Sequence, residues 1–397
     1  MNIAFLTTEY ITEKNFAGGL ANYLHRVSLG LAQLGHTIRI FVLTDNEDEI
    51  KYKGLIVHRI KYAPFNHALI KKLWKTVNMI RGANALKAAV LKQHDKEKID
   101  IVQAASYKAT GYTLAQSGRM PVVTRISSFT PLWREANGLP ARLDDILSEK
   151  IELGLLRRSQ GVYAPCGVLA KHIKKIAPIN IEIIRPPFFQ DLENKDQGLF
   201  EQTVKGKDYL LFYGSLVRLK GIEFILKNLV KILSENEKIY FLFVGKFGDE
   251  SVIKKHAAPF ENRVRYFDAM PRSRLIPFIE NAKAIILPSM IDNLPNTCLE
   301  AMSLKKIVIT THASGFGDVI EHGVDGFLIN FGEDKAFLNI IREVCRMDNN
   351  TINAIGEKAG KKIKEMFSEK TNLNAIIDYF QYIINQWNSR RHNARRG

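Results

Sequence analysis

The first half of the chain alternates short apolar runs with segments of helical periodicity. Residues 2–7 are mostly apolar, a Gly18-Gly19 pair follows, and residues 20–34 carry apolar side chains at helical spacing. The next apolar run, residues 37–44, completes a β-α-β unit with two glycines at its strand-to-helix turn. Further buried strands are predicted at residues 55–60, 101–104, 122–126, 162–164 and 181–184. This order predicts a mostly parallel sheet.

A second alternation follows a polar, charged stretch at residues 190–207, which we interpret as a linker. Strands are predicted at residues 209–213, 240–244, 264–267, 284–287, 307–310 and 327–329. Helices are predicted at residues 222–234, 272–281, 297–303 and 336–347. A last helix carries one apolar stripe, formed by Leu373, Ile376, Ile377, Phe380, Ile383, Ile384 and Trp387. The spacing indicates that this helix buries one face.

The length of 397 residues exceeds what one hydrophobic core usually supports, so two domains are expected. We find no apolar run of about 18 residues and no signal-peptide pattern, which favours a cytoplasmic protein or one bound peripherally at the inner face of a membrane. Cys166, Cys298 and Cys345 lack metal-ligand spacing. Neither a disulfide framework nor a metal site is therefore expected.

The charge balance narrows the possible partners. There are 57 Lys and Arg residues against 41 Asp and Glu, a formal net charge of +16, which favours polyanionic partners. Because no zinc-finger spacing, helix-turn-helix pattern or RNA-binding aromatic motif is found, nucleic acid is not expected. Nucleotide phosphate and anionic membrane lipid fit this charge better.

The stretch PSMIDNLPNTCLEAM, residues 288–302, carries the most chemical information. It follows a predicted strand and places Asp292 and Glu300 on either side of a turn that begins a helix. Free N–H groups and the positive dipole end of that helix suit a phosphate group. The two carboxylates can accept hydrogen bonds that sugar hydroxyls donate. The alternative is that Asp292 is a turn residue and Glu300 a first-turn acid that complements the helix dipole.

This stretch resembles the signature of the retaining family-4 glycosyltransferases, in which the first acid is usually Glu within a Glu-Gly-Leu-Pro-Asn run. Here the run is Asp292-Asn293-Leu294-Pro295-Asn296. The resemblance implies the GT-B fold: two facing Rossmann-like domains, each a mostly parallel sheet wrapped by helices, with a C-terminal helix crossing back to the first domain. The expected division is an acceptor-side domain at 1–189, a linker at 190–207, a donor-side domain at 208–370, and the crossing helix with a basic tail at 371–397.

The resemblance also implies which residues hold the leaving group. The segment FYGSLVRLKG, residues 212–221, resembles the family loop whose cations neutralise the departing diphosphate. Lys220 matches that pattern directly. Ser215 replaces the family's Arg, so Arg218 is the available second cation, or else a solvated surface charge. Asp292 would face the transferred sugar, which makes Asp292, Lys220 and Arg218 the expected catalytic residues.

The remaining donor contacts are expected along the helix start. By the same resemblance, Glu300 would accept hydrogen bonds from the ribose hydroxyls, and the backbone amides of Asn296, Thr297 and Leu299 would bind the diphosphate. Gly245 follows the strand at residues 240–244, at the place where the family wraps the base. Base contacts there are largely made by the backbone, so the side chains do not distinguish UDP from GDP.

Two segments of the first half complete the expected site. Gly18 and Gly19 would let the backbone approach the donor phosphate or the transferred sugar. Residues 121–129 resemble a family strand that commonly ends Arg-Leu-His-Thr, but the His position is Ser127 here. Arg125 and Ser127 are therefore the expected polar contacts on the acceptor side.

Residues 66–94 carry six Lys or Arg and no acidic residue. Five apolar residues of this segment fall on one helical face with three lysines opposite, as in an interfacial helix: Leu69, Ile70, Leu73, Val77 and Ile80, against Lys71, Lys72 and Lys75. A helix packed on the core with a solvated basic back gives the same pattern. Four arginines between Arg390 and Arg396 add a basic tail.

The function implied is a retaining glycosyltransferase that moves a hexose-like sugar from a nucleoside diphosphate sugar to a hydroxyl of a saccharide or lipid-linked acceptor, in cell-surface polysaccharide or glycolipid synthesis. No cofactor or metal is expected, because protein cations and helix dipoles neutralise the leaving group. A non-catalytic sugar-nucleotide-binding relative is one alternative. A nicotinamide-dependent oxidoreductase is another, and it would want a Gly-x-Gly-x-x-Gly turn that the sequence lacks.

Overall fold

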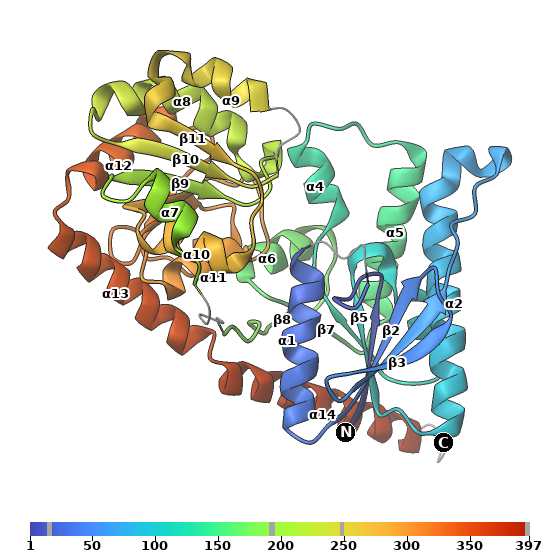
Figure 1. Cartoon of the computed structure of the whole chain (residues 1–397). Helices are drawn as coiled ribbons and strands as arrows, with labels where there is room; N and C mark the ends of the chain where they lie inside the picture. The colour runs from blue at the N-terminus through green and yellow to red at the C-terminus, as the bar shows by residue number, and fades with distance from the viewer. Residues whose placement is uncertain (14–17, 190–194, 247–249, 394–397) are drawn as a thin grey trace. The chain divides into compact units, whose positions relative to one another are not determined.

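The computed structural model describes residues 1–13, 18–189, 195–246 and 250–393. The chain forms two compact units: unit 1 comprises Met1–Phe188 with Glu369–Gly397, and unit 2 comprises Phe189–Ser368. Each is a mainly parallel sheet flanked by helices, so the predicted α/β fold class is confirmed (Figure 1). Within the described residues, no helix combines the length and apolar character that a membrane-spanning segment requires.

The sheet of unit 1 has eight strands in the order β3-β4-β2-β1-β5-β6-β7-β8. All neighbouring strands are parallel except β3 and β4. The strands are β1 (Asn2–Thr7), β2 (Thr37–Thr44), β3 (Asp48–Tyr52), β4 (Leu55–Lys61), β5 (Ile101–Ala105), β6 (Val122–Arg125), β7 (Gly161–Ala164) and β8 (Glu182–Ile183). The sequence missed β3, a largely exposed edge strand joined to β4 by a tight turn at Lys53 and Gly54, both with positive φ.

Helices cover both faces of this sheet. Helix α1 packs with the C-terminal helix α14 on one face, whereas α2, α3 and α5 contribute side chains to a second core cluster. The helices that precede unit 2 are α1 (Gly19–Gln33), α2 (Trp74–Lys96), α3 (Tyr112–Ser117), α4 (Thr130–Ala136), α5 (Leu143–Arg158) and α6 (Gly167–Ile176), with 3₁₀ turns η1 (Ala68–Leu73) and η2 (Tyr107–Ala109). The predicted helix at residues 20–34 is α1, and Leu24, Val27 and Leu31 of its apolar stripe are buried, whereas Leu34 is exposed.

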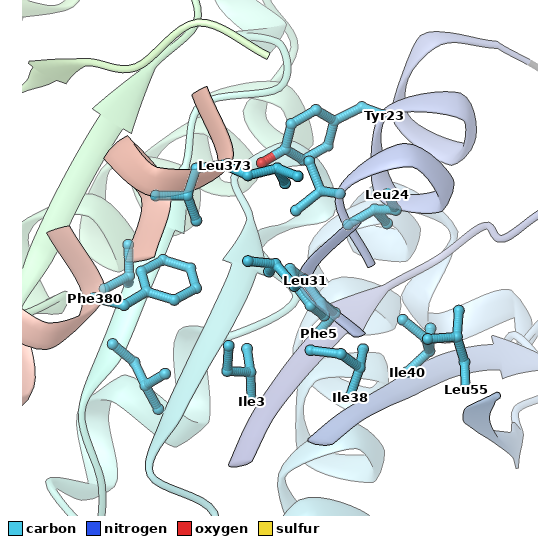
Figure 2. Close-up of a cluster of buried hydrophobic side chains, with 14 of the residues drawn as sticks. Ile3, Phe5, Tyr23, Leu24, Leu31, Ile38, Ile40, Leu55, Leu373 and Phe380 are labelled. Carbon is cyan, nitrogen blue, oxygen red and sulfur yellow. The ribbon is translucent and has the colours of Figure 1, made fainter. Parts of the chain in front are cut away.

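Helix α14 (Glu369–Asn393) returns to unit 1, as the resemblance implied. Its buried Leu373, Ile376, Phe380 and Ile383 belong to the same hydrophobic cluster as strand β1 and helix α1 (Figure 2). The approach to α1 is close: a Cβ atom added to Gly30 would lie 2.4 Å from Cδ1 of Leu373. Unit 1 is therefore built from two separate stretches of the chain that share one core.

The sheet of unit 2 has six parallel strands in the order β11-β10-β9-β12-β13-β14. These are β9 (Tyr209–Tyr213), β10 (Tyr240–Val244), β11 (Val264–Phe267), β12 (Ala284–Leu287), β13 (Val308–Thr311) and β14 (Phe327–Ile329). The helices are α7 (Gly198–Thr203), α8 (Ile222–Glu235), α9 (Glu250–Ala257), α10 (Arg272–Glu280), α11 (Asn296–Ser303), α12 (Asp334–Arg346) and α13 (Asn349–Met366). All six predicted strands are present.

Part of the predicted linker is structured. Residues 195–207 belong to unit 2 and contain α7, while residues 190–194 lie outside the described residues. Within unit 2, Nε of Arg274 donates to Asp196 at 2.8 Å, and Lys195 forms an ion pair with Glu280 at 2.6 Å. These contacts fix the stretch to α10.

The basic segment does not form the interfacial helix that its periodicity suggested. A 3₁₀ turn, η1, precedes α2, so the apolar residues from 69 to 80 do not follow one continuous helical repeat. Helix α2 instead buries a face that includes Met79, Ala83, Leu86 and Val90, and Ile80 is exposed. The core-packed alternative is therefore the correct one for α2.

Candidate active site

The loop between β12 and α11 is held by backbone bonds from two neighbouring segments. The amide of Met290 donates to the carbonyl of Leu219 at 2.9 Å, and the amide of Gly315 donates to the carbonyl of Asp292 at 2.9 Å. The hydroxyl of Thr311 donates to the carbonyl of Ser289 at 2.6 Å. These bonds fix Asp292 at the carboxyl end of the unit 2 sheet, where ligands of parallel α/β sheets commonly bind.

Lys220 and Asp292 meet in an ion pair between Nζ and Oδ2. The residue after Lys220 explains how the two loops come so close. Gly221 has φ +79°, and a Cβ atom there would lie 2.0 Å from the carbonyl oxygen of Pro288. Glycine is required at that position because backbone lies against backbone. The structure thus brings together two of the three predicted catalytic residues, with the Lys220 side chain 36% exposed.

Arg218 is placed differently. It lies in the 3₁₀ turn η3 (Arg218–Lys220), its side chain is 53% exposed, and its Nε lies 3.8 Å from a carboxylate oxygen of Glu223. This is the geometry of a solvated surface pair, which is worth little energetically. The catalytic role of Arg218 remains a prediction.

The start of α11 combines helix geometry with a fixed backbone. Asn296 and Thr297 occupy the first turn, where amides have no acceptor within the helix. The amides of Cys298 and Leu299 already donate to the carbonyl of Pro295, at 3.1 and 3.3 Å. Of the three amides assigned to the diphosphate, those of Asn296 and Thr297 therefore suit it better than that of Leu299.

Glu300 has a partner that sequence reasoning missed. Nη1 of Arg272, the first residue of α10, lies 3.1 Å from Oε1 of Glu300. Within the described structure, Nε and Nη2 of Arg272 are buried without a hydrogen-bond partner. The ion pair holds the Glu300 carboxylate, and no motif in the sequence relates these two positions, which lie on different helices.

Tyr213 also holds the first turn of helix α11. Its hydroxyl donates to the carbonyl of Thr297 at 2.6 Å. Burial, with a smaller contribution from the Glu300 charge, raises the pKa of Tyr213 well above its ordinary value. The phenol therefore stays protonated and acts as a fixed donor.

Position 245 requires a glycine because the backbone at the end of β10 lies against the backbone at the end of β9. It has φ +152°, and a Cβ atom there would lie 1.8 Å from the carbonyl oxygen of Gly214. Its amide donates to Phe267, and its carbonyl accepts from the hydroxyl of Tyr266 at 2.9 Å. Both backbone groups are engaged within the fold, which accounts for the glycine without a ligand. Its donor contact remains a prediction.

Of the four predicted residues of unit 1, Gly18 and Gly19 lie at the start of α1, and Arg125 and Ser127 lie at the carboxyl end of β6. Gly18 has φ +118° and precedes α1, which begins at Gly19 and has no acidic residue in its first turn. Arg125 ends β6; it is 7% exposed, and its guanidinium lies 3.5 Å from the centre of the Tyr23 ring. The amide of Ser127 donates to Oγ of Ser106 at 3.1 Å.

Comparison with known proteins shows family matches in both halves of the chain. A family model described as Glycosyltransferase Family 4 matches residues 17–188, and one described as Glycosyl transferases group 1 matches residues 195–362. The capsular polysaccharide biosynthesis glycosyltransferase CapM of Staphylococcus aureus is 24% identical over 189 residues, 46% of this chain and 48% of that protein. The match thus spans about half the length of that relative. The uncharacterised glycosyltransferase MJ1607 of Methanocaldococcus jannaschii is 23% identical over 83% of this chain and 85% of that protein.

Solved structures show the same fold. Sucrose-phosphate synthase from Thermosynechococcus elongatus has a TM-score of 0.78 at 15% identity, covering 97% of this chain and 100% of that chain. Anabaena HepE in complex with UDP-glucose has a TM-score of 0.69 at 18% identity, covering 96% and 99%. The chain is a family-4-like glycosyltransferase with the GT-B fold.

Proposed function

We propose that the protein transfers a hexose-like sugar from a nucleoside diphosphate sugar to a hydroxyl acceptor, with retention of configuration. The observation that carries the proposal is the Lys220–Asp292 pair beside the α11 helix start. A cation, a carboxylate and orphan amides suit a sugar diphosphate better than they suit a neutral ligand. The UDP and UDP-glucose complexes of the structural neighbour HepE support the same donor class.

In the proposed reaction, the bond between the anomeric carbon and the diphosphate oxygen breaks, and its electron pair leaves with the diphosphate. The acceptor hydroxyl attacks from the same face and passes its proton to the departing phosphate oxygen. Lys220 and the amides of Asn296 and Thr297 would stabilise the charge that develops there. Asp292 would face the sugar. These groups supply the neutralisation for which other transferases use a metal, so we propose a metal-independent transfer.

Donor binding tests this proposal directly. Thermal stability is measured with UDP, GDP, UDP-glucose and GDP-mannose, because a ligand that binds only the folded state raises its stability. In Glu300→Gln, loss of a charged acceptor worth about 1.5–3 kcal/mol should weaken nucleotide binding roughly 10- to 150-fold. Glu357→Gln is the matched control, since it removes an exposed carboxylate paired with Lys305. Equal nucleotide affinity in both variants would exclude Glu300 from the donor site.

An assay of turnover distinguishes a catalytic protein from a non-catalytic sugar-nucleotide-binding relative. A catalytic protein releases free nucleoside diphosphate from its donor when an acceptor is present, whereas a binding protein shows only the thermal shift. The names of relatives such as CapM support a role in polysaccharide or glycolipid synthesis. We propose acceptors of that class, either saccharides or lipid-linked saccharides.

We also propose that the net charge of +16 brings the protein to anionic membrane lipid. The exposed lysines of η1, Lys71 and Lys72, are the best contacts, and Lys75 is not, because it pairs with Asp145 at 3.2 Å. Each basic residue near such a surface contributes about 1 kcal/mol. Cosedimentation with anionic vesicles should fall with salt and in the double variant Lys71→Glu with Lys72→Glu. Absence of cosedimentation at low salt would refute this location.

A further inference from the structure

The ion pair between Arg272 and Glu300 joins two helices that follow strands far apart in the sheet of unit 2. Arg272 begins α10, which follows β11, and Glu300 lies in α11, which follows β12. Strands β10 and β9 lie between these two strands, so the pair bridges three strand spacings, or about 14 Å. Because both helices begin at the carboxyl ends of their strands, the contact lies at the edge where parallel sheets place ligands.

The Arg272 side chain reverses the usual arrangement of a surface arginine. Arginine normally packs its methylene stem against the protein and leaves its charged head in water. Here 37% of the side chain is exposed, yet Nε and Nη2 are buried and, in the part of the chain that the structure describes, have no hydrogen-bond partner. The guanidinium group is therefore directed into the protein and not toward solvent.

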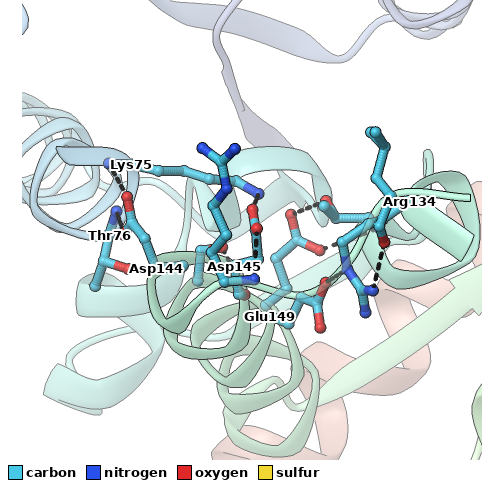
Figure 3. A network of polar contacts seen from close by, with 11 residues as sticks. Lys75, Thr76, Arg134, Asp144, Asp145 and Glu149 are labelled. Atoms are coloured by element: carbon cyan, nitrogen blue, oxygen red, sulfur yellow. Dashed lines mark hydrogen bonds and ion pairs between the residues drawn. The ribbon is translucent and has the colours of Figure 1, made fainter. Parts of the chain in front are cut away.

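Arg134 of unit 1 shows how an arginine is held when its contacts serve stability (Figure 3). Its Nε donates to Glu149 at 3.0 Å, and its Nη1 donates to the carbonyl of Leu139 at 3.3 Å. Arg272 instead contacts Oε1 of Glu300 through Nη1, at 3.1 Å, and leaves two buried nitrogens unsatisfied among the described residues. Buried donors without partners are destabilising and uncommon, so the placement of Arg272 calls for an explanation other than stability.

Glu300 stays within reach of a ligand while Arg272 holds it. The Glu300 side chain is 16% exposed, and the ion pair restricts its rotation. A side chain that is already restricted loses less conformational entropy when a ligand binds. The ion pair therefore prepares the carboxylate for hydrogen bonding in one orientation.

Tyr213 lies in the same cluster. Burial is the main cause of its raised pKa, and the charges of Glu300 and Arg272 contribute in opposite directions, so the three side chains lie close together. The hydroxyl of Tyr213 also donates to the carbonyl of Thr297 at 2.6 Å. The helix that carries Glu300 is thus fixed at its first turn, and its carboxylate is fixed by Arg272.

From this arrangement we propose that Arg272 is a positioning residue of the donor site, which holds the Glu300 carboxylate in the orientation that accepts hydrogen bonds from the ribose hydroxyls of the donor. The inference rests on the proposed function and adds to it a residue that determines selectivity for ribose. Because Arg272 acts through Glu300, its loss should weaken ligands that carry ribose hydroxyls and spare ligands that lack them.

The test compares nucleotides that differ only in these hydroxyls. Binding of UDP and of 2′,3′-dideoxyuridine diphosphate to the full chain is measured by calorimetry, with GDP and its dideoxy counterpart as a second pair. For the base that the natural protein binds, the ribonucleotide should bind at least about 10-fold more tightly than the dideoxynucleotide, since hydrogen bonds to a charged acceptor are strong. In Arg272→Met this ratio should fall to about 3-fold or less, mostly through weaker binding of the ribonucleotide.

Arg274→Met is the matched control. Arg274 lies on the same helix, its side chain is 53% exposed, and it pairs with Asp196 at 2.8 Å, so the variant removes an equal charge that does not contact Glu300. Its ratio between ribonucleotide and dideoxynucleotide should equal that of the natural protein. Arg272→Lys supplies one donor for Oε1 and should restore the ratio to about 5-fold or more.

A double variant shows whether Arg272 acts through Glu300. Adding Arg272→Met to Glu300→Gln should leave the ratio at the value of Glu300→Gln alone, because two residues that act as one unit are not additive. The double variant leaves neither charge of the pair without its partner. It therefore keeps the test decisive if circular dichroism shows that Arg272→Met alone does not fold.

Two outcomes would overturn the positioning role. Equal weakening of ribonucleotide and dideoxynucleotide in Arg272→Met would mean that Arg272 contacts another part of the nucleotide or supports the fold. A further fall of the ratio in the double variant would mean that Arg272 acts independently of Glu300. Binding of UDP or GDP would leave the proposed donor site standing in both cases, whereas a natural protein that binds neither nucleotide would refute the proposed function and the role of Arg272 together.

Discussion

Glu152 makes unit 1 sensitive to pH in a direction that can be worked out from its surroundings. Burial raises the pKa of this carboxyl from 4.5 to about 7, although hydrogen bonds from Thr130 and the charge of Lys75 act against the rise. The folded state therefore holds the proton more tightly than the unfolded state does. Stability from this group is fully present below pH 4.5 and is lost as pH rises through about 7.

The size of the effect follows from the same two pKa values. A difference of about 2.5 pH units, at about 1.4 kcal/mol for each unit, gives roughly 3–4 kcal/mol as an upper bound. Glutamine keeps the amide oxygen as an acceptor for the Thr130 hydroxyl but cannot ionise. Glu152→Gln should therefore be less stable than or equal to the natural protein at pH 5 and more stable than it at pH 8.

Urea unfolding followed by tryptophan fluorescence measures this in unit 1 alone, because Trp74, Trp133 and Trp387 all lie in that unit. The free energy of unfolding is compared at pH 5, 6, 7 and 8 for the natural protein, Glu152→Gln and the control Glu135→Gln, an exposed acid on α4. Parallel pH profiles for Glu152→Gln and the natural protein would show that Glu152 ionises normally, and the reasoning would fail.

Three further predictions concern other parts of the fold. Lys220→Ala should weaken UDP binding about 10-fold or more and UMP binding less, as measured by calorimetry, because the ammonium group would face the diphosphate in the proposed donor complex; equal losses would contradict its role. Gly221→Ala should destabilise unit 2 by more than about 1 kcal/mol, seen by circular dichroism, since its Cβ would lie 2.0 Å from the carbonyl oxygen of Pro288. Leu373→Ala should destabilise unit 1 by about 2–5 kcal/mol in urea, and a loss below that range would mean that α14 adds little to the core.

The sequence predicted the buried strands best, because continuous apolar runs of four or five residues have few alternatives. Strands β9, β10 and β12 begin and end where the apolar runs do. The exposed strand β3 was missed, since only its pairing with β4 makes it a strand. In the basic segment, the regular spacing of apolar residues concealed the change from a 3₁₀ turn to an α-helix at Trp74.

The sequence likewise predicted some features of the candidate site and missed others. The family resemblance pointed to Lys220 and Asp292, and the structure adds that the two form an ion pair, which depends on Gly221 and on the backbone of Pro288. Arg272 could not be found from spacing, because its contact with Glu300 joins two helices through the tertiary fold. A cavity of about 1200 Å³ in unit 1 was equally hidden, since its lining residues are spread from Thr8 to Glu152.

The return of α14 to unit 1 has a consequence for biosynthesis. A ribosome delivers residues 1–188 first and residues 369–393 only after the whole of unit 2 has emerged. The face of α1 that contacts Leu373 and Phe380 therefore stays exposed while unit 2 is translated and folds. During that interval the nascent chain exposes a hydrophobic surface that is prone to aggregation. Binding of chaperones at α1 would protect this surface until α14 packs against it.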